Sequence, residues 1–299
     1  MNNQKLLFIF NPKSGLGLIR NHLLDIVDIM VKENFDVTVY PTQAKADAIR
    51  KVKEDGRNYN RIVCCGGDGT LDEVVTGMRE AELDIPLGYI PAGSTNDFAS
   101  SIGIPGDMIK AAKIAVGKKS KAFDVGQFNE DTFVYIAAFG MFTEISYETP
   151  QELKNVLGHM AYILSAAKSL AAIPTYQLHV ETSGQIIDDN FIYGMVTNST
   201  SVAGFKGLTG KQVELSDGEF EVTLIKPPKD AIELGEIIAY LMGDGAPTKM
   251  VYRFKADRIR VSAQKPIPWT MDGEFGGKHE NVDIKNLCKK VQILVDKKK

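Results

Sequence analysis

Short apolar runs alternate with helical periodicity over the first 125 residues of the chain. The first run, Leu6–Phe10, is continuously apolar, as expected of a parallel strand whose two faces are both buried. These runs predict strands at residues 6–10, 37–40, 62–65 and 85–90. Between them, apolar residues recur at helical spacing, which predicts helices around residues 18–31, 44–54 and 74–78. This alternation predicts an α/β domain, in which helices cover the faces of a parallel sheet.

The pattern changes after Val125, where strand-like segments follow one another with few helices between them. These segments cover residues 133–139, 176–181, 187–197, 220–225, 251–261 and 291–295. Two stretches in this part, residues 152–172 and 230–242, are predicted to be helical. Strands separated by turn residues predict an antiparallel sandwich or barrel. We therefore expect an α/β domain at residues 1–125 and a β-sandwich domain at residues 126–299, with the ligand in the cleft between them.

Composition excludes several classes of protein. With 44% hydrophobic residues among 299, the chain has enough apolar side chains for buried cores and is not a disordered sequence. Its 35 basic and 38 acidic residues leave a net charge of −3, without the basic excess of a nucleic-acid-binding surface. The longest apolar stretch, near residues 161–173, is broken by Lys168, so no transmembrane segment is predicted. Three cysteines without metal-ligand spacing indicate a reducing, cytoplasmic compartment.

Three glycine-bearing loops follow strands of the first domain. They are Asn11–Gly15 (NPKSG), Gly66–Thr70 (GGDGT) and Pro91–Asp97 (PAGSTND). All three are expected at the carboxyl edge of the sheet, where open α/β sheets bind ligands. Glycines there let backbone N–H groups approach phosphate oxygens, and a following helix N-terminus favours an anion. The loops therefore predict a phosphate site, although neither the GxxxxGK[ST] motif nor the GxGxxG fingerprint is present.

These loops, together with Met271-Asp272-Gly273-Glu274, resemble the diacylglycerol kinase catalytic family, including the bacterial lipid kinases. The GGDGT loop alone is also similar to loops of NAD kinases and phosphofructokinases, whereas PAGSTNDFA and MDGE are more specific. The resemblance extends over nearly the whole chain. It implies an ATP-binding domain with a parallel sheet of the phosphofructokinase and NAD kinase type, followed by a β-rich domain that holds the lipid.

The same resemblance implies which residues contact the nucleotide. They are Asn11, Pro12, Lys13, Ser14, Gly15, Thr42, Gly66, Gly67, Asp68, Gly69, Thr70, Ser94 and Asn96. Two positions depart from the family pattern: Ser94 replaces the more common Thr, and Asp72 replaces the usual Asn. Because a second carboxylate close to phosphate is unfavourable unless a cation screens it, no nucleotide contact is assigned to Asp72.

Phosphoryl transfer to an alcohol needs charge neutralisation, in-line positioning and a base for the attacking hydroxyl. By resemblance, Glu274 is the proton acceptor, and Gly273 beside it permits the tight turn that presents the carboxylate. Asp68 and Asp97 are assigned to catalysis and to Mg²⁺, which binds a few carboxylates and keeps several waters. Asp124 is a further metal candidate, with a structural cap of the strands that join the domains as its alternative.

A second, structural Mg²⁺ is implied for the segment Leu215–Phe220 (LSDGEF). Its ligands by resemblance are the Asp217 carboxylate and the backbone carbonyls of Glu214 and Glu219. One carboxylate with backbone carbonyls suits a hard cation. An ordinary β-turn at Ser-Asp-Gly explains the same residues without a metal.

The function expected from these features is an ATP- and Mg²⁺-dependent lipid kinase that converts diacylglycerol to phosphatidic acid. It would be a cytoplasmic protein that meets its lipid at the membrane surface and that can form a homodimer. Related enzymes phosphorylate other lipid alcohols, such as sphingoid bases, ceramide and phosphatidylglycerol. Two alternatives remain at this stage: an NAD kinase-like enzyme, and a regulator that binds lipid or nucleotide without catalysis.

Overall fold

The computed structural model describes residues 4–140, 173–200, 202, 209, 213–243 and 245–296. Within it the chain divides into two compact units. Unit 1 comprises Met1–Val125 and Cys288–Lys299, and unit 2 comprises Gly126–Leu287. The helix predicted at residues 152–172 lies outside the described residues.

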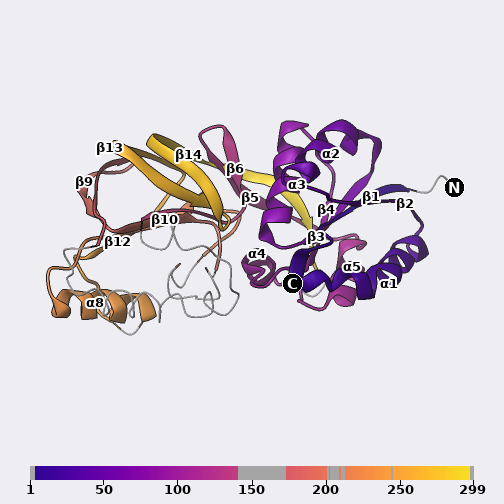
Figure 1. Cartoon of the computed structure of the whole chain (residues 1–299), viewed down its shortest axis with the longest axis horizontal. Helices are drawn as coiled ribbons and strands as arrows, with labels where there is room; N and C mark the ends of the chain where they lie inside the picture. Colours follow the sequence, from indigo (N-terminus) through magenta and orange to yellow (C-terminus); the bar gives the residue numbers. More distant parts are fainter. Residues whose placement is uncertain are drawn as a thin grey trace. The chain divides into compact units, whose positions relative to one another are not determined.

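A parallel sheet forms the centre of unit 1 (Figure 1). Its strands are β1 (Gln4–Phe10), β2 (Phe35–Pro41), β3 (Arg61–Gly66) and β4 (Leu87–Pro91). They pair in the order β2-β1-β3-β4, and β2 has no further described neighbour. All residues of β3 and β4 are buried, which agrees with the apolar run Ile62–Cys65 and with the apolar residues of β4, whereas Arg61 at the start of β3 is a buried charged residue.

Helices cover both faces of this sheet. They are α1 (Ile19–Lys32), α2 (Asp47–Asp55), α3 (Asp68–Glu80), α4 (Asp97–Ile102) and α5 (Met108–Ala115), with short 3₁₀ turns η1 (Ser14–Gly17) and η2 (Gly56–Asn58). The helix α1 packs against α5 and β2, whereas α2 packs against α3. Figure 1 shows these two pairs on opposite faces of the sheet. The predicted α/β architecture of the first domain is confirmed.

Unit 2 is rich in antiparallel strands. They are β6 (Asp131–Phe133), β7 (Ile136–Gly140), β8 (Tyr176–Thr182), β9 (Ile186–Phe191), β10 (Tyr193–Thr197), β11 (Phe220–Ile225), β12 (Val251–Ala256), β13 (Arg258–Met271) and most of β14 (Glu274–Leu294). The strand β5 (Ser120–Phe128) leads into this unit, and its helix α8 spans Ala231–Met242. The predicted β-rich second domain is confirmed.

The strand β13 takes part in two neighbouring sets of strands. Its end pairs with β7, which continues to β10, β11 and β12, while its first half pairs with β8 and then β9. A register shift between Ser262 and Ile267 separates the two halves. Side chains of both sets enclose a buried core in which the Trp269 ring lies 4.9 Å from Phe139 and 5.1 Å from Phe128. This is a sandwich-like arrangement, as the strand-rich sequence predicts.

Several boundaries differ from those predicted. The apolar stretches 187–197 and 251–261 each form two strands, with breaks at Ile192 and Asp257. The strand predicted at 291–295 is the end of the much longer β14, whose Ile293 pairs in parallel with Leu87 of β4. Because of that pairing, the chain from Cys288 onwards belongs to unit 1, whereas the sequence predicts that the second domain continues to Lys299.

Candidate active site

The first glycine loop is held against the end of β3 and against the third loop. The Asn11 backbone N–H donates to the Cys65 carbonyl at 3.0 Å, and the Asn11 side chain accepts from the Lys13 N–H at 2.9 Å. Gly15 has a φ of +54°, and a Cβ at this position would lie 2.1 Å from the Ala92 carbonyl oxygen. Only glycine satisfies both the conformation and the close approach.

The second and third loops interlock in the same way. The Ala92 N–H donates to the Gly66 carbonyl at 2.8 Å. The Asn96 side chain accepts from the Gly93 N–H and donates to the Gly93 carbonyl, both at 2.8 Å. A Cβ on Gly93 would lie 2.7 Å from the Cα of Gly67. The three loops therefore form one compact surface of backbone, which is the arrangement that cradles phosphate oxygens.

Two buried carboxylates lie at this surface. Asp68 and Asp97 occupy the first turns of α3 and α4, and the Asp97 N–H donates to Asp68 Oδ2 at 3.1 Å. Beneath them, the Tyr89 hydroxyl donates to the Gly66 carbonyl at 3.3 Å. Burial raises the pKa of Tyr89 well above its ordinary value, and the Asp68 charge adds to this, so the phenol stays a neutral donor.

This donor set fits Mg²⁺ bound together with a nucleotide. No cluster of three or more His, Cys, Asp or Glu side chains with metal-binding geometry occurs among the residues that the structure describes. Mg²⁺ seldom needs such a cage, because it binds one or two carboxylates and completes its shell with water and phosphate oxygens. Asp68 and Asp97, next to the backbone loops, supply two such carboxylates, and water and phosphate oxygens would complete the shell.

The other predicted nucleotide residues of unit 1 lie at the same edge of the sheet. Thr42 is buried directly after β2, and its N–H donates to the Phe10 carbonyl at 2.9 Å. Thr70 is buried in the first turn of α3, where its N–H donates to the Gly67 carbonyl at 3.1 Å. Lys13 and Ser94 are exposed. The structure thus brings the predicted nucleotide residues together, while their contacts with ATP stay a prediction.

Glu73 was not among the predicted site residues. It follows Asp72 on α3, and its carboxylate accepts from the backbone N–H groups of Ala46 and Ala48 at 2.8 and 3.2 Å. It therefore holds the start of α2, whose own N-cap residue, Ala46, has no side chain to cap the helix. No local sequence signal points to this role, because the contact spans more than 20 residues.

Asp124 is fully buried in β5, and its Oδ1 accepts from the Lys289 backbone N–H at 2.7 Å. The contact joins β5 to β14. It is the kind of contact expected if Asp124 is a structural cap of strands, the alternative to a metal ligand. A metal role for Asp124 stays a prediction.

The carboxylate predicted to act as base lies on a two-residue hairpin between β13 and β14. Met271 pairs with Glu274, and the turn residues Asp272 and Gly273 have φ values of +49° and +86°. Positive φ at both positions is typical of a type I′ turn, for which Asp-Gly is a preferred sequence. The turn leaves Glu274 exposed at the start of β14.

Asp272 anchors this hairpin and was not among the predicted site residues. Its Oδ2 accepts from the Val134 N–H at 2.6 Å, and its Oδ1 accepts from the N–H groups of Tyr135 and Ile136 at 3.0 Å each. The Asp272 N–H in turn donates to the Ile136 carbonyl at 2.9 Å. The buried carboxylate therefore satisfies three backbone donors and fixes the turn that carries Glu274.

The segment proposed to hold a structural ion is a turn before β11. Asp217 Oδ1 accepts from the Glu219 N–H at 3.1 Å, and its Oδ2 accepts from Lys255 Nζ at 2.6 Å. Lys255 also lies 3.4 Å from the buried carboxylate of Glu221, whose pKa is raised by burial to about 7. The ammonium of Lys255 thus neutralises the Asp217 carboxylate, at the position where a cation would bind, as expected of a structural turn. Cation binding by Asp217, Glu214 and Glu219 stays a prediction.

Comparison with known proteins agrees with the geometry. The family model described as "Diacylglycerol kinase catalytic domain" matches residues 5–128, which include all three glycine loops. The diacylglycerol kinase of Bacillus subtilis is 31% identical over 293 residues, covering 97% of this chain and 96% of the relative. The chain belongs to the diacylglycerol kinase family. The resemblance noted from the sequence motifs is therefore confirmed.

Matches to other family members also cover most of both chains. The diacylglycerol kinase of Staphylococcus aureus strain JH9 is 33% identical over 274 residues, covering 90% of this chain and 86% of the relative. A solved structure from Bacillus anthracis, described as that of a diacylglycerol kinase, covers 100% of this chain and 99% of its own, with a TM-score of 0.77 and 22% identity. At that identity it shows the shared fold. These relatives favour a lipid kinase over an NAD kinase-like enzyme or a non-catalytic regulator.

None of the described helices is both long and apolar enough to cross a membrane.

The contact between Gly93 and Gly67 predicts the effect of a single methyl group. We expect Gly93→Ala to raise the KM for ATP at least about tenfold, equivalent to about 1.4 kcal/mol, because the new Cβ pushes the second and third loops apart. Gly106→Ala is the matched control, since no atom lies within 4 Å of its Cβ position. Steady-state kinetics over a range of ATP concentrations measures both variants, and an unchanged KM in Gly93→Ala would contradict the role of this contact.

Proposed function

We propose that this protein transfers the γ-phosphoryl group of ATP to the free hydroxyl of diacylglycerol, which gives phosphatidic acid and ADP. The observation that carries the proposal is the backbone surface of the three interlocked loops, with Asp68 and Asp97 buried beside it. Membership of the diacylglycerol kinase family supplies the substrate class.

In this proposal the loops bind the triphosphate through backbone N–H groups, at the positive N-terminal end of α3. Asp68 and Asp97 hold Mg²⁺, directly or through water. When bound, Mg²⁺ neutralises the negative charge of the phosphates during transfer. The exposed hydroxyl of Ser94 and the ammonium of Lys13 add donors at the rim of the loops.

Glu274 has the role of base. Its carboxylate accepts the proton of the lipid hydroxyl as that oxygen attacks the γ-phosphorus, so that ADP leaves with the electrons of the broken P–O bond. A fixed turn suits this role, because a base must be held within hydrogen-bond reach of the proton that it removes. The three hydrogen bonds of Asp272 supply that rigidity.

The substrate also determines where the reaction takes place. Diacylglycerol is confined to a bilayer by its acyl chains, so the enzyme meets it at the membrane surface without spanning the membrane. We further propose a cytoplasmic location and a homodimeric state.

A substrate screen tests the proposed function. The protein is incubated with labelled ATP and Mg²⁺ and with detergent-dispersed diacylglycerol, sphingosine, phosphatidylglycerol or NAD in separate reactions. We expect labelled phosphatidic acid to be the main product. Preferential labelling of sphingosine or phosphatidylglycerol would overturn the choice of lipid, and labelling of NAD alone would overturn the lipid kinase proposal.

The second metal site has a separate test. If Asp217 binds Mg²⁺ with the carbonyls of Glu214 and Glu219, Mg²⁺ raises the melting temperature of the wild-type protein, because a ligand of the native state adds to its stability. Asp217→Ala removes that response, whereas Asp257→Ala, at an exposed acid before β13, keeps it. A wild-type melting temperature that is the same with chelator and with Mg²⁺ would contradict a metal site here and leave the ion pair of Asp217 with Lys255.

A further inference from the structure

The connection between β2 and α2, residues 42–46, is held to α3 by one side chain. The Glu73 carboxylate accepts from the Ala46 N–H at 2.8 Å through Oε1 and from the Ala48 N–H at 3.2 Å through Oε2. Both donors lie at the start of α2, where backbone N–H groups have no partner within the helix. Glu73 thus does from another helix what an N-cap side chain usually does. We call this contact the Glu73 clasp.

The residue inside the clasp has an unusual backbone conformation. Ala46 has a φ of 62° and a ψ of 8°, which lie in the left-handed region. This region is unfavourable for alanine, because its Cβ comes too close to the following carbonyl oxygen, whereas glycine adopts it readily. A residue in such a conformation persists only where its surroundings hold it, and such residues cluster at functional sites. The two hydrogen bonds of Glu73 supply that support.

The clasp fixes the far end of a segment that begins among the predicted nucleotide residues. Thr42 is buried, and its N–H donates to the end of β1 at 2.9 Å, so this residue continues the pairing of β2 with β1. The next three residues are exposed, and the Gln43 N–H donates to Asp47 Oδ2 at 2.9 Å. That bond lies within the connection and α2, whereas the clasp joins the connection to α3. The segment is therefore attached to the rest of unit 1 at both of its ends.

The place of this connection along the sheet indicates which part of ATP it meets. The strands pair in the order β2-β1-β3-β4, and the three glycine loops follow β1, β3 and β4. Neighbouring strands are about 4.8 Å apart, so the ends of β2 and β3 are about 10 Å apart. With the triphosphate on the glycine loops, as proposed above, the nucleoside is the part of ATP left to contact the connection after β2.

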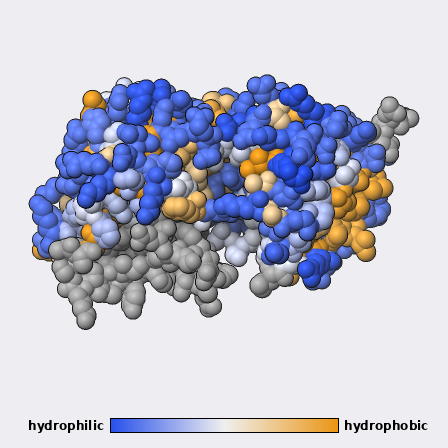
Figure 2. Space-filling model, turned by 45° about the horizontal axis from the view of Figure 1, so that its top comes forward, coloured by the Kyte–Doolittle hydropathy of each residue, from blue (hydrophilic) through white to orange (hydrophobic). Residues whose placement is uncertain are grey.

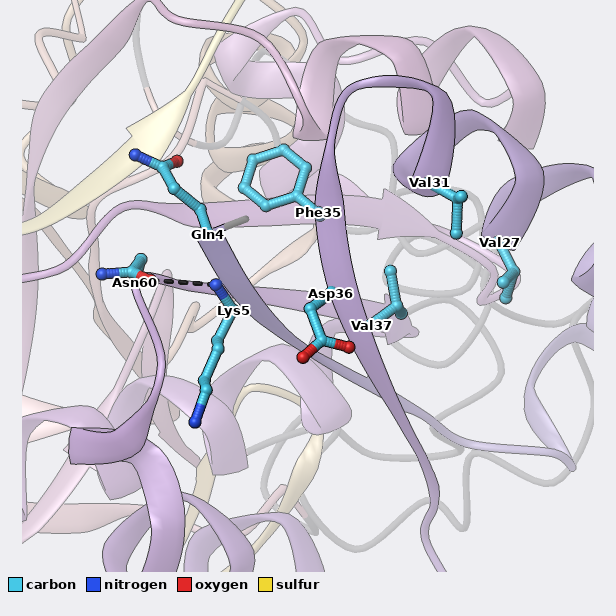
Figure 3. Close-up of a pocket in the computed structure, with 8 residues that line it drawn as sticks. All are labelled: Gln4, Lys5, Val27, Val31, Phe35, Asp36, Val37 and Asn60. Carbon is cyan, nitrogen blue, oxygen red and sulfur yellow. Dashed lines mark hydrogen bonds between the residues drawn. The ribbon is translucent and has the colours of Figure 1, made fainter. Parts of the chain in front are cut away.

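A hollow at the other edge of the same sheet is too distant to hold the nucleoside. It has a volume of about 880 Å³ and lies at the amino end of β2, where Phe35, Asp36 and Val37 line it (Figure 3). Since a strand rises about 3.3 Å per residue, Asp36 is about 20 Å from Thr42. Figure 2 shows hydrophobic surface beside the grey N-terminal residues, where Figure 1 places α1 and β2. The glycine loops lie at the opposite edge, together with the Glu73 clasp.

We propose that Glu73 is a positioning residue for the nucleoside part of ATP. It holds Ala46 in the left-handed conformation and thereby ties the connection that carries Thr42 to α3, whose first turn carries Asp68 and Thr70. The phosphate loops are held by their own interlocking hydrogen bonds and do not depend on the clasp. This inference rests on the nucleotide site of the proposed function and not on the choice of lipid.

Loss of the clasp should affect ATP and inorganic tripolyphosphate differently. In Glu73→Gln the amide oxygen can accept from one of the two N–H groups, while the NH₂ group faces the other and cannot accept. The fraction of protein with the connection in place falls, and the apparent dissociation constant for ATP rises in proportion. We expect an increase of at least about tenfold for Mg-ATP, as for the loss of one hydrogen bond to a charged group. The affinity for Mg-tripolyphosphate, which has no nucleoside, should stay unchanged.

The matched control is Glu80→Gln on the same helix. The Glu80 carboxylate lies 2.6 Å from Lys53 Nζ of α2, so it also joins α3 to α2, but at the end of α3 away from the glycine loops. This variant should bind both ligands as the wild type does. Calorimetric titration of each full-length protein with Mg-ATP and with Mg-tripolyphosphate measures the effect, and steady-state kinetics should show a raised KM for ATP with kcat unchanged in Glu73→Gln.

A second substitution tests the part played by Ala46. Because glycine adopts the left-handed conformation without support, Ala46→Gly in the Glu73→Gln protein should restore most of the lost ATP affinity. In the otherwise wild-type protein, Ala46→Gly should leave ATP binding unchanged. The melting temperature of every variant shows that it is folded at the temperature of the titration.

Each other outcome overturns the inference. Unchanged ATP binding in Glu73→Gln would remove the positioning role, and equal weakening of ATP and tripolyphosphate would show that Glu73 acts on the whole edge of the sheet. An equal loss in Glu80→Gln would assign the effect to the packing of α2 on α3. Failure of Ala46→Gly to restore binding would overturn the role of the strained residue. A wild-type protein that binds neither ligand would instead overturn the nucleotide site of the proposed function itself.

Discussion

Glu274→Gln should leave ATP binding unchanged and lower kcat by a factor of about 10²–10⁴, the usual contribution of a general base. The amide keeps the size and the hydrogen-bonding reach of the carboxylate but cannot accept the proton of the lipid hydroxyl. Because Glu274 is exposed on a hairpin, the substitution should not alter stability. The measurement is kcat and KM for diacylglycerol and ATP, with the melting temperature of each protein.

The matched control is Glu280→Gln, an exposed glutamate of the same strand, β14, which should behave as the wild type. A variant at Glu274 with normal turnover would remove this residue from the mechanism. Equal losses in both variants would indicate a general effect of charge rather than a base at one position.

Asp272→Ala should affect stability and turnover together. The substitution leaves the buried N–H groups of Val134, Tyr135 and Ile136 without their acceptor, which should lower the free energy of unfolding by at least about 3 kcal/mol. Because the turn that carries Glu274 is then no longer fixed, kcat should fall by a factor on the order of 10². We therefore regard Asp272 as a positioning residue, and its loss should change kcat far more than the KM for ATP.

Asp230→Ala separates these two effects. Asp230 accepts from the Ile232 and Glu233 N–H groups as the N-cap of α8, so its loss should cost about 1 kcal/mol of stability. It should not change kcat at a temperature where the variant is folded. Normal turnover in folded Asp272→Ala would show that the carboxylate only stabilises unit 2, whereas a similar loss in Asp230→Ala would attribute both effects to stability.

The strand–helix alternation of the first 125 residues and the strand-rich second part could be predicted because they depend on local periodicity. The short helices α4 and α5 and the strand β5 were missed. With few turns, the short helices show little periodicity of their own, and the sequence of β5 mixes polar and apolar residues without a clear apolar run. The strand breaks at residues 134–135, at Ile192 and at Asp257 were also missed. The apolar pattern continues through residues 134–135 and Ile192, and the exposed acid Asp257 stands between two segments that both look like strands.

At the site, the sequence by itself determined the three glycine loops and the Asp-Gly turn, because the geometry of such turns demands particular residue types at adjacent positions. Only the tertiary structure decided which carboxylates act as anchors. Asp272 meets backbone donors 136 to 138 residues away, Glu73 holds a helix more than 20 residues before it, and the end of β14 returns to β4. Local pattern cannot encode such contacts, because their partners become neighbours only when distant segments pack together.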